Sequence, residues 1–275
     1  MLASKDKTGS AARARVIVTT SWDDDAASGL KVAELLGSRA MPGTFFVPTG
    51  ELGEAGKFND RDLRSLASAG FEIGAHTVSH KMLTTLAEAE LVREVGDCKQ
   101  TLQQILGREV TTFCYPKGRF NAQVIRQVER AGYLGARTTK MLSSSLVFSR
   151  FEMPTTIQAY PHSRSNYVKN LVRLRAVPTL AKELPDLISF EGWSQLGKKL
   201  FDQALHDGGI WHLYGHPWEI ERLNLWSQLA NMLDYVAKRE GVTYLTNGQI
   251  LKEMQPQGRA AHDVVASDRK HTLVH

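Results

Sequence analysis

Two short segments of the sequence contain residue types that hold metal ions. Residues 21–25 read Ser-Trp-Asp-Asp-Asp, and a bare fold has little reason to place three mutually repelling carboxylates side by side. Residues 76–80 read His-Thr-Val-Ser-His, and two imidazoles four residues apart converge on one ion if the loop makes a helical turn. Taken singly, each segment has an ordinary explanation, because carboxylates favour helix N-termini and loop histidines often face solvent.

Two further segments combine polar and aromatic residues. Residues 113–119 read Phe-Cys-Tyr-Pro-Lys-Gly-Arg, which predicts a tight loop whose backbone amides could face a ligand, although an ordinary turn explains it equally well. Residues 211–219 read Trp-His-Leu-Tyr-Gly-His-Pro-Trp-Glu. Strand alternation places His212, Tyr214 and His216 on one side, although His212 could also be a hydrogen-bonded core residue.

A repeated strand–helix pattern surrounds these segments. Apolar and β-branched runs predict strands at residues 16–20, 44–47, 71–75, 111–114, 134–138, 210–214 and 243–245. Asn59 and Asn121 are expected N-caps, and Thr85 with Glu88 fits a capping box. Residues 142–190 interrupt the pattern, with one helix near residues 166–175. The alternation implies parallel strands with right-handed crossovers, and the strand count favours an α/β barrel over an open sheet.

All four chemical segments follow predicted strands directly. In a barrel the carboxyl ends of the parallel strands share one face, and that face carries the site. Carboxylates and imidazoles that converge on this face are typical of a metal-dependent hydrolase. Their shared position favours this interpretation over four separate, unrelated explanations.

Composition excludes some other classes of function. The chain of 275 residues has a net charge of +5, but its basic residues are scattered, so nucleic-acid binding is not expected. No stretch approaches the roughly 18 continuous apolar residues that a membrane helix needs, so membrane spanning is not expected either. Cys98 and Cys114 form no CxxC pair, and the N-terminus has no apolar signal core, so a cytoplasmic location is expected. We expect a single domain at residues 14–255 with mobile ends at 1–13 and 256–275, and the oligomeric state stays open.

At these four segments the sequence resembles the polysaccharide deacetylases, the NodB-homology domains of carbohydrate esterase family 4. Residues 21–25 resemble the family motif Thr-Phe-Asp-Asp-Gly, and residues 76–80 match His-Ser/Thr-x-x-His fully. Residues 113–118 are similar to the third motif and residues 213–216 to the last, Leu-x-x-His. Order and spacing agree across about residues 15–245. The resemblance implies a deformed (β/α) barrel of about seven parallel strands.

The resemblance also implies a catalytic metal held by Asp24, His76 and His80. Three protein ligands leave coordination open for water and substrate. Zinc is the expected metal, with cobalt, nickel and iron as alternatives, because two imidazoles and one carboxylate suit all four.

The remaining roles follow from the same resemblance. Asp23 is the expected general base, His216 the acid that protonates the leaving amine, and the Lys117 backbone N–H an oxyanion donor. Four aromatic side chains could form a wall against a sugar face, although such residues are also common packing: Trp22, Tyr115, Tyr214 and Trp218.

Two departures from the family pattern need compensation. Cys114 stands where many members carry an arginine that braces the catalytic carboxylate, and the fourth motif has no clear counterpart. We hypothesise that Arg137 supplies the missing positive charge near Asp23. Either Glu219 or Asp25 is expected to orient the acid His216.

The sequence therefore predicts a metal-dependent deacetylase, a hydrolase of carbon–nitrogen bonds other than peptide bonds, acting on an N-acetylated sugar or polysaccharide. A hydrolase of a small non-sugar amide or imide on the same scaffold is one alternative. The other is a non-catalytic barrel that binds metal and sugar.

Overall fold

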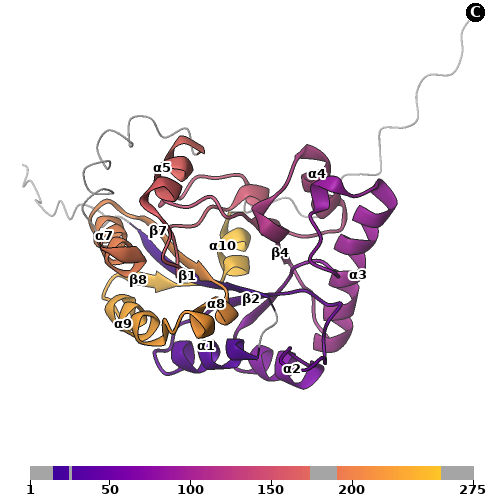
Figure 1. The fold of residues 1–275 in the computed structure, drawn as a ribbon, viewed down its shortest axis with the longest axis horizontal. Coiled ribbons are helices and arrows are strands. Elements are labelled where there is room, and N and C mark those ends of the chain that lie inside the picture. The colour runs from indigo at the N-terminus through magenta and orange to yellow at the C-terminus, as the bar shows by residue number, and fades with distance from the viewer. Residues whose placement is uncertain (1–14, 25–26, 174–190, 255–275) are drawn as a thin grey trace, which may run out of the picture.

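The computed structural model describes residues 15–24, 27–173 and 191–254. Among these residues, eight strands form one parallel sheet, in which seven follow the order β5-β4-β3-β2-β1-β7-β6 and β8 pairs with β1 (Figure 1). The strands are β1 (Val16–Asp23), β2 (Thr44–Val47), β3 (Glu72–Ala75), β4 (Thr112–Cys114), β5 (Gly135–Arg137), β6 (Ile157–Gln158), β7 (Gly209–Gly215) and β8 (Val242–Tyr244).

Strand β1 lies at the centre of the sheet and is buried along its whole length. One edge pairs with β7 from Val16 to Trp22. The other edge pairs first with β8, up to Val18, and then with β2, from Ser21 to Asp23. The apolar β-branched start of β1 suits a strand that is covered on both faces. The site carboxylates therefore lie at the carboxyl end of this enclosed strand, with Asp23 as its last residue and Asp24 directly after it.

The sheet curls into a deformed barrel, as the sequence predicts. Edge strands β5 and β6 do not pair with each other directly. Instead, Met153 forms a bridge with Arg137 at the end of β5, and the chain then continues into β6, which pairs with β7. A short connecting segment thus spans the gap where a regular barrel would close.

Most of the helices surround the sheet and pack their apolar faces against it, whereas α10 lies inside the ring that the others form (Figure 1). The helices are α1 (Ser28–Gly37), α2 (Asp60–Ser68), α3 (Glu88–Leu106), α4 (Ala122–Arg130), α5 (Arg164–Arg173), α7 (Gly192–Asp207), α8 (Pro217–Arg222), α9 (Trp226–Val236) and α10 (Asn247–Glu253), with short 3₁₀ turns η1 (Leu83–Thr85), η2 (Pro116–Gly118) and η3 (Arg150–Glu152). Among the described residues, no helix combines the length and apolar character that a membrane crossing requires.

The predicted helix starts are partly confirmed. Asn59 and Asn121 accept backbone N–H groups at the starts of α2 and α4, as expected. The capping box at Thr85 and Glu88 is wrong, because α3 begins after Ala87, which makes no side-chain cap. The Thr85 hydroxyl instead donates to the Met82 carbonyl inside η1.

Some sequence predictions fall partly or wholly outside the described residues. The expected mobile ends, residues 1–13 and 256–275, cannot be compared with the structure, and neither can Asp25. Helix α5 corresponds to the helix expected near residues 166–175. Short elements β6, α8 and α10 were not predicted, since two to seven residues carry too little periodicity.

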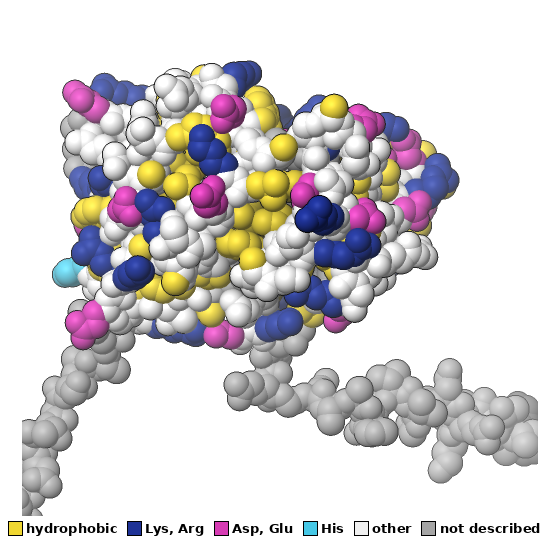
Figure 2. Space-filling view, turned by 90° about the horizontal axis from the view of Figure 1, so that it is seen from below, with side chains coloured by type: hydrophobic (Ala, Val, Ile, Leu, Met, Phe, Trp, Pro, Cys, Tyr) yellow, Lys and Arg dark blue, Asp and Glu magenta, His cyan; other side chains and the backbone are white. Residues whose placement is uncertain are grey.

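Charged side chains are mixed by sign on the face that Figure 2 shows. Lys and Arg side chains alternate there with Asp and Glu, and hydrophobic side chains gather between them. A basic stripe of the kind that tracks a phosphate backbone is therefore not present on this face.

Candidate metal centre

Asp24 faces both histidines of the 76–80 segment across the carboxyl ends of β1 and β3. Its Oδ1 lies 3.5 Å from His80 Nε2 and 3.8 Å from His76 Nε2. Candidate ligand atoms of the three residues all lie within 4.8 Å of one another. The parallel strands thus bring together the carboxylate and imidazoles that the sequence singled out.

The loop from His76 to His80 is not the helical turn that the sequence reasoning assumed. Thr77 and His80 have left-handed backbones, with φ of 70° and 52°, which non-glycine residues adopt only when the surroundings hold them. The Thr77 hydroxyl accepts the His80 N–H at 3.0 Å, which closes the loop. The two imidazoles therefore converge because of this hydrogen-bonded loop, and not because they are one helical turn apart.

His76 has its ring orientation fixed from behind. Its Nδ1 lies 2.8 Å from the Cys114 carbonyl oxygen, and because a carbonyl only accepts, Nδ1 carries the proton. Burial lowers the pKa of His76 to about 4, so the ring is neutral near pH 7. Its Nε2 lone pair then faces Asp24, which is the arrangement that metal-ligating histidines adopt.

The three residues fit a divalent metal of the zinc type. Zn–N and Zn–O bonds of about 2.0–2.2 Å place ligand atoms up to roughly 4 Å apart around one ion, which the distances of 3.5 and 3.8 Å from Asp24 Oδ1 to the two imidazoles satisfy. A second cluster, Asp23, His76 and Cys114, has similar spacing. It fits less well, because burial raises the pKa of the Cys114 thiol and Asp23 already pairs with a guanidinium.

Asp23 pairs with Arg137 in the barrel interior, where both side chains are buried. Burial alone would raise the pKa of Asp23, but the guanidinium, with smaller contributions from His76 and His216, lowers it to about 2. The Arg137 guanidinium also lies over the ring of Tyr214, 4.8 Å from its centroid. Asp23 is therefore ionised throughout the physiological pH range.

His216 lies between two carboxylates. Its Nδ1 is 2.7 Å from Glu219 Oε2, and its Nε2 is 3.8 Å from Asp23 Oδ2. Burial opposes the charged ring, but Glu219, together with the nearby aspartates, raises the pKa of His216 above its usual value. Among the described residues, Glu219 is thus the carboxylate that orients His216.

Comparisons with known proteins found a family model that matches part of the chain. Residues 11–136 match the family model of the polysaccharide deacetylases. This part of the chain is similar to the polysaccharide deacetylase family, and the match spans less than half of the 275 residues. The matched stretch contains the three candidate metal ligands, whereas Arg137 and His216 lie beyond it.

One curated relative is YxkH of Bacillus subtilis, whose name assigns it to the polysaccharide deacetylases. It is 26% identical over 100 residues, which cover 36% of this chain and 36% of YxkH. The similarity thus spans about a third of the length of that relative.

Solved structures share the fold. A Mycobacterium smegmatis protein assigned to the polysaccharide deacetylases has a TM-score of 0.64 at 18% identity, covering 92% of this chain and 94% of its own. The wild-type family 4 pseudoenzyme BA3943 of Bacillus anthracis has a TM-score of 0.53 at 15% identity, covering 86% and 66%. At these identities the likeness establishes the deacetylase fold alone.

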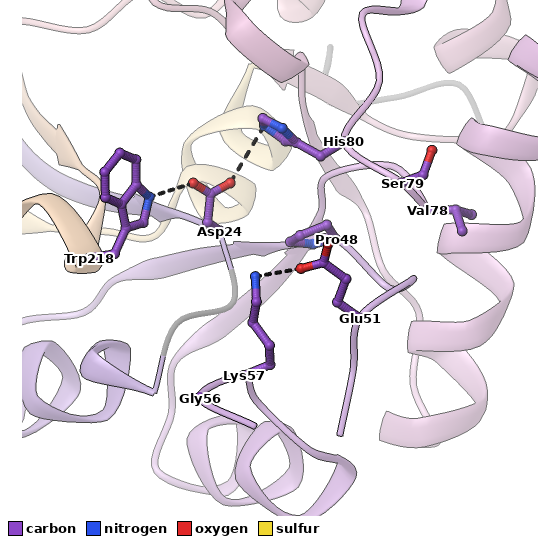
Figure 3. Close-up of a pocket in the computed structure, with 9 residues that line it drawn as sticks. All are labelled: Asp24, Pro48, Glu51, Gly56, Lys57, Val78, Ser79, His80 and Trp218. Atoms are coloured by element: carbon purple, nitrogen blue, oxygen red, sulfur yellow. Dashed lines mark hydrogen bonds and ion pairs between the residues drawn. The ribbon is translucent and has the colours of Figure 1, made fainter. Parts of the chain in front are cut away.

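A pocket of about 480 Å³ opens beside the candidate metal ligands. Figure 3 shows its lining, which comprises Asp24, Pro48, Glu51, Gly56, Lys57, Val78, Ser79, His80 and Trp218. The volume lies in the range of small-ligand sites.

The aromatic wall expected from the sequence is largely wrong. Trp22 and Tyr115 are buried in the core, so neither ring can face a ligand in the pocket. Tyr214 is also buried and donates its hydroxyl to Gln158 Oε1 at 2.6 Å. Only Trp218 of the four lines the pocket, with 38% of its surface exposed.

Lys117 lies in η2, directly after β4. Its φ of 55° is left-handed, and Gly118 continues this conformation with a φ of 61°. A Cβ on Gly118 would meet the Thr139 side chain at 2.0 Å, so glycine is required for this tight turn. The role of the Lys117 N–H as an oxyanion donor stays a prediction.

Two functional neighbours were missed by sequence reasoning. Glu94 of α3 is buried and accepts the N–H groups of Val78 and Ser79, each at 2.9 Å, which fixes the histidine loop. A glutamate on the apolar face of a predicted helix, beside Leu91 and Val95, was the available signal.

Gln158 was the second residue missed. Its Oε1 lies 2.6 Å from the Tyr214 hydroxyl and 2.7 Å from His162 Nε2, while its Nε2 donates to Glu219 Oε2 at 3.2 Å. Tyr214 and His162 therefore fix the orientation of the Gln158 amide. The NH₂ group of that amide then holds the Glu219 carboxylate, which in turn contacts His216. The two-residue strand β6 offers no sequence signal for this position.

Proposed function

We propose that this protein is a metal-dependent hydrolase that removes an acetyl group from an N-acetylated sugar or polysaccharide. The observation that carries the proposal is the cluster of Asp24, His76 and His80 at one pocket, beside the Asp23–His216 pair. The similarity of residues 11–136 to the polysaccharide deacetylases supports the same reaction class.

Asp24, His76 and His80 would hold the metal, with zinc the expected ion and cobalt, nickel or iron as alternatives. A metal bound there supplies two effects, a lowered pKa of bound water and polarisation of the acyl oxygen. His76 is prepared for this role by its neutral ring and by the carbonyl that holds its Nδ1 proton.

Asp23 is the proposed general base, and Arg137 is the proposed positioning residue for it. The guanidinium keeps Asp23 ionised and fixes its direction, at the expense of basicity, which falls with pKa. The same carboxylate lies 3.8 Å from His216 Nε2, so the proposed base and acid are neighbours in the site.

His216 is the proposed acid. Glu219 on its Nδ1 favours the protonated ring, and a proton on Nε2 could then pass to the leaving amine. Without such a proton, amine expulsion from an amide is very slow. The Lys117 backbone N–H is the proposed oxyanion donor, a contribution typically worth about 3 kcal/mol.

The test is metal-dependent acetate release from N-acetylglucosamine oligomers by the full chain. We expect turnover with added zinc or cobalt, loss of turnover with a chelator, and recovery when metal is restored. Asp23→Asn should lose turnover by a factor of about 10² or more. Because this variant leaves the buried Arg137 without its carboxylate, thermal unfolding has to show that it is folded. Acetate release that persists in the chelated protein would disprove the proposal.

Two other results would favour the alternatives. Hydrolysis of cyclic amides or imides, with no acetate released from sugars, would favour the small-amide enzyme. Saturable sugar binding without any product would favour the binding barrel. Retention of both Asp23 and His216 speaks against pure binding, since binding alone needs neither.

A further inference from the structure

Trp218 connects the candidate metal site to the wall of the pocket. Its indole Nε1–H donates to Asp24 Oδ2 at 2.8 Å. The other oxygen of the same carboxylate, Oδ1, faces His76 and His80. Figure 3 shows Asp24 lying between Trp218 on one side and His80 on the other.

Asp24 needs such external support. Its backbone has a φ of 69°, a left-handed conformation that costs a non-glycine residue on the order of 1 kcal/mol or more. An indole N–H is a donor only, so it ties up Oδ2 as an acceptor and fixes the rotation of the carboxylate. Oδ1 is then left pointing toward the imidazoles.

Trp218 is itself held in place. The Arg222 guanidinium lies 4.9 Å from the centroid of its ring, one turn further along α8. On the side of the acid, the ring of His216 lies 5.8 Å away at an angle of 45°. A partly exposed tryptophan with these contacts is a fixed donor rather than a loose surface ring.

We propose that Trp218 is a positioning residue that fixes the Asp24 carboxylate with one oxygen toward His76 and His80, and thereby strengthens divalent-metal binding. This inference rests on the proposed function, because it takes those three residues as the metal ligands. It extends to this tryptophan the general rule that hydrogen bonds behind metal ligands set their orientation.

The deciding variant is Trp218→Phe, which removes the N–H and keeps an aromatic ring in the pocket wall. The matched control is Trp226→Phe. Trp226 also donates its indole N–H to a carboxylate, Glu221 at 2.6 Å, and also has a cation over its ring, Lys31 at 4.1 Å. It is not among the residues that line the pocket.

The measurement is the zinc affinity of the metal-free full chain, obtained by competition with a chromophoric chelator. Loss of a hydrogen bond behind a metal ligand typically weakens binding about 10- to 100-fold, and we expect this for Trp218→Phe. Trp226→Phe should match the wild type within about twofold. With cobalt in place of zinc, the visible spectrum should change for Trp218→Phe alone, because the released carboxylate can rotate.

Three results would overturn the inference. The first is wild-type zinc affinity in Trp218→Phe. The second is an equal loss of affinity in both variants, which would indicate general destabilisation. The third is a raised KM for the sugar with unchanged zinc affinity, which would limit Trp218 to the pocket wall.

Failure of the inference can be told apart from failure of the proposed function. If the wild-type protein binds zinc and releases acetate while Trp218→Phe binds zinc equally well, the inference alone is wrong. If the wild-type protein binds no zinc, the inference on Trp218 and the proposed function are both wrong. Thermal unfolding of the metal-free variants checks that each one is folded.

Discussion

Cys114 on β4 and Arg137 on β5 are register partners on neighbouring parallel strands, and Arg137 pairs with the buried carboxylate of Asp23. Register partners in adjacent strands project their side chains to the same face, with backbones about 4.8 Å apart. The guanidinium that the family resemblance leads one to expect at position 114 is therefore replaced by one from the next strand.

This relationship predicts a rescue experiment. Arg137→Gln should destabilise the protein by about 3–5 kcal/mol, because it leaves Asp23 buried without its cation. Adding Cys114→Arg should restore part of that stability by supplying the guanidinium from the adjacent strand. Urea unfolding measures both effects, and Cys114→Ser in the same Arg137→Gln background is the control. A double variant no more stable than Arg137→Gln would show that the two positions are not interchangeable.

Glu94 gives a second prediction, for the histidine loop. Glu94→Leu removes the oxygen that accepts the backbone N–H groups of Val78 and Ser79, so we expect a loss of about 1–3 kcal/mol in stability and weaker zinc binding. Glu90→Leu on the same helix removes a partly exposed pair with Lys81 and should change stability by less than about 0.5 kcal/mol. Equal effects of the two substitutions would argue against a role for Glu94 in the loop.

His212 gives a third prediction, for the pH dependence of stability. Burial lowers the pKa of His212 from 6.5 to about 3, while its ring contacts the Ser21 hydroxyl and the Pro154 carbonyl. Above pH 6.5 the ring is neutral in both states and has no effect. As pH falls from 6.5 toward 3, only the unfolded chain takes up the proton, so stability decreases by about 1.4 kcal/mol per pH unit. The wild type should therefore lose stability faster than His212→Gln over this range, and parallel urea-unfolding curves would contradict the prediction.

Glu219 gives a fourth prediction, for the pH profile of acetate release. Glu219 supports the protonated form of His216, so Glu219→Gln should lower the pKa of His216 and move the basic limb of the kcat profile to lower pH. Gln158→Leu, which removes a donor to Glu219 without a change of charge, should shift the limb less. Histidine NMR of the metal-free protein checks the same order directly, and a basic limb unmoved by Glu219→Gln would exclude His216 as its source.

The sequence predicted those features that depend on local patterns. Asn59 and Asn121 were identified as caps because an amide side chain before an apolar helical run has a local signature. Asp24, His76 and His80 could be brought together because the ends of parallel strands share an edge. The order of the strands predicted that residues 21–25 and 76–80 meet, whereas the choice of Asp24 among the three aspartates came from the family resemblance.

The features that the sequence missed depend on contacts between distant residues. The bond from Trp218 to Asp24 joins residues almost 200 positions apart and depends on one rotamer of each. Trp22 was misplaced for a different reason, since strand alternation already directs its ring away from the face that carries Asp23. The expected cytoplasmic location stays a prediction.

The position of β1 also has a consequence for how the molecule folds. The carboxylates that follow β1 are synthesised early, but β1 has to wait for β7, its partner along Val16–Trp22, before one of its edges is paired. Pairing between such distant segments slows folding, because the long intervening chain has to be ordered first. The end of β1 that carries the site carboxylates should therefore form late. In folding intermediates of this protein, the amide hydrogens of β1 should exchange with solvent until β7 and β8 have paired with it.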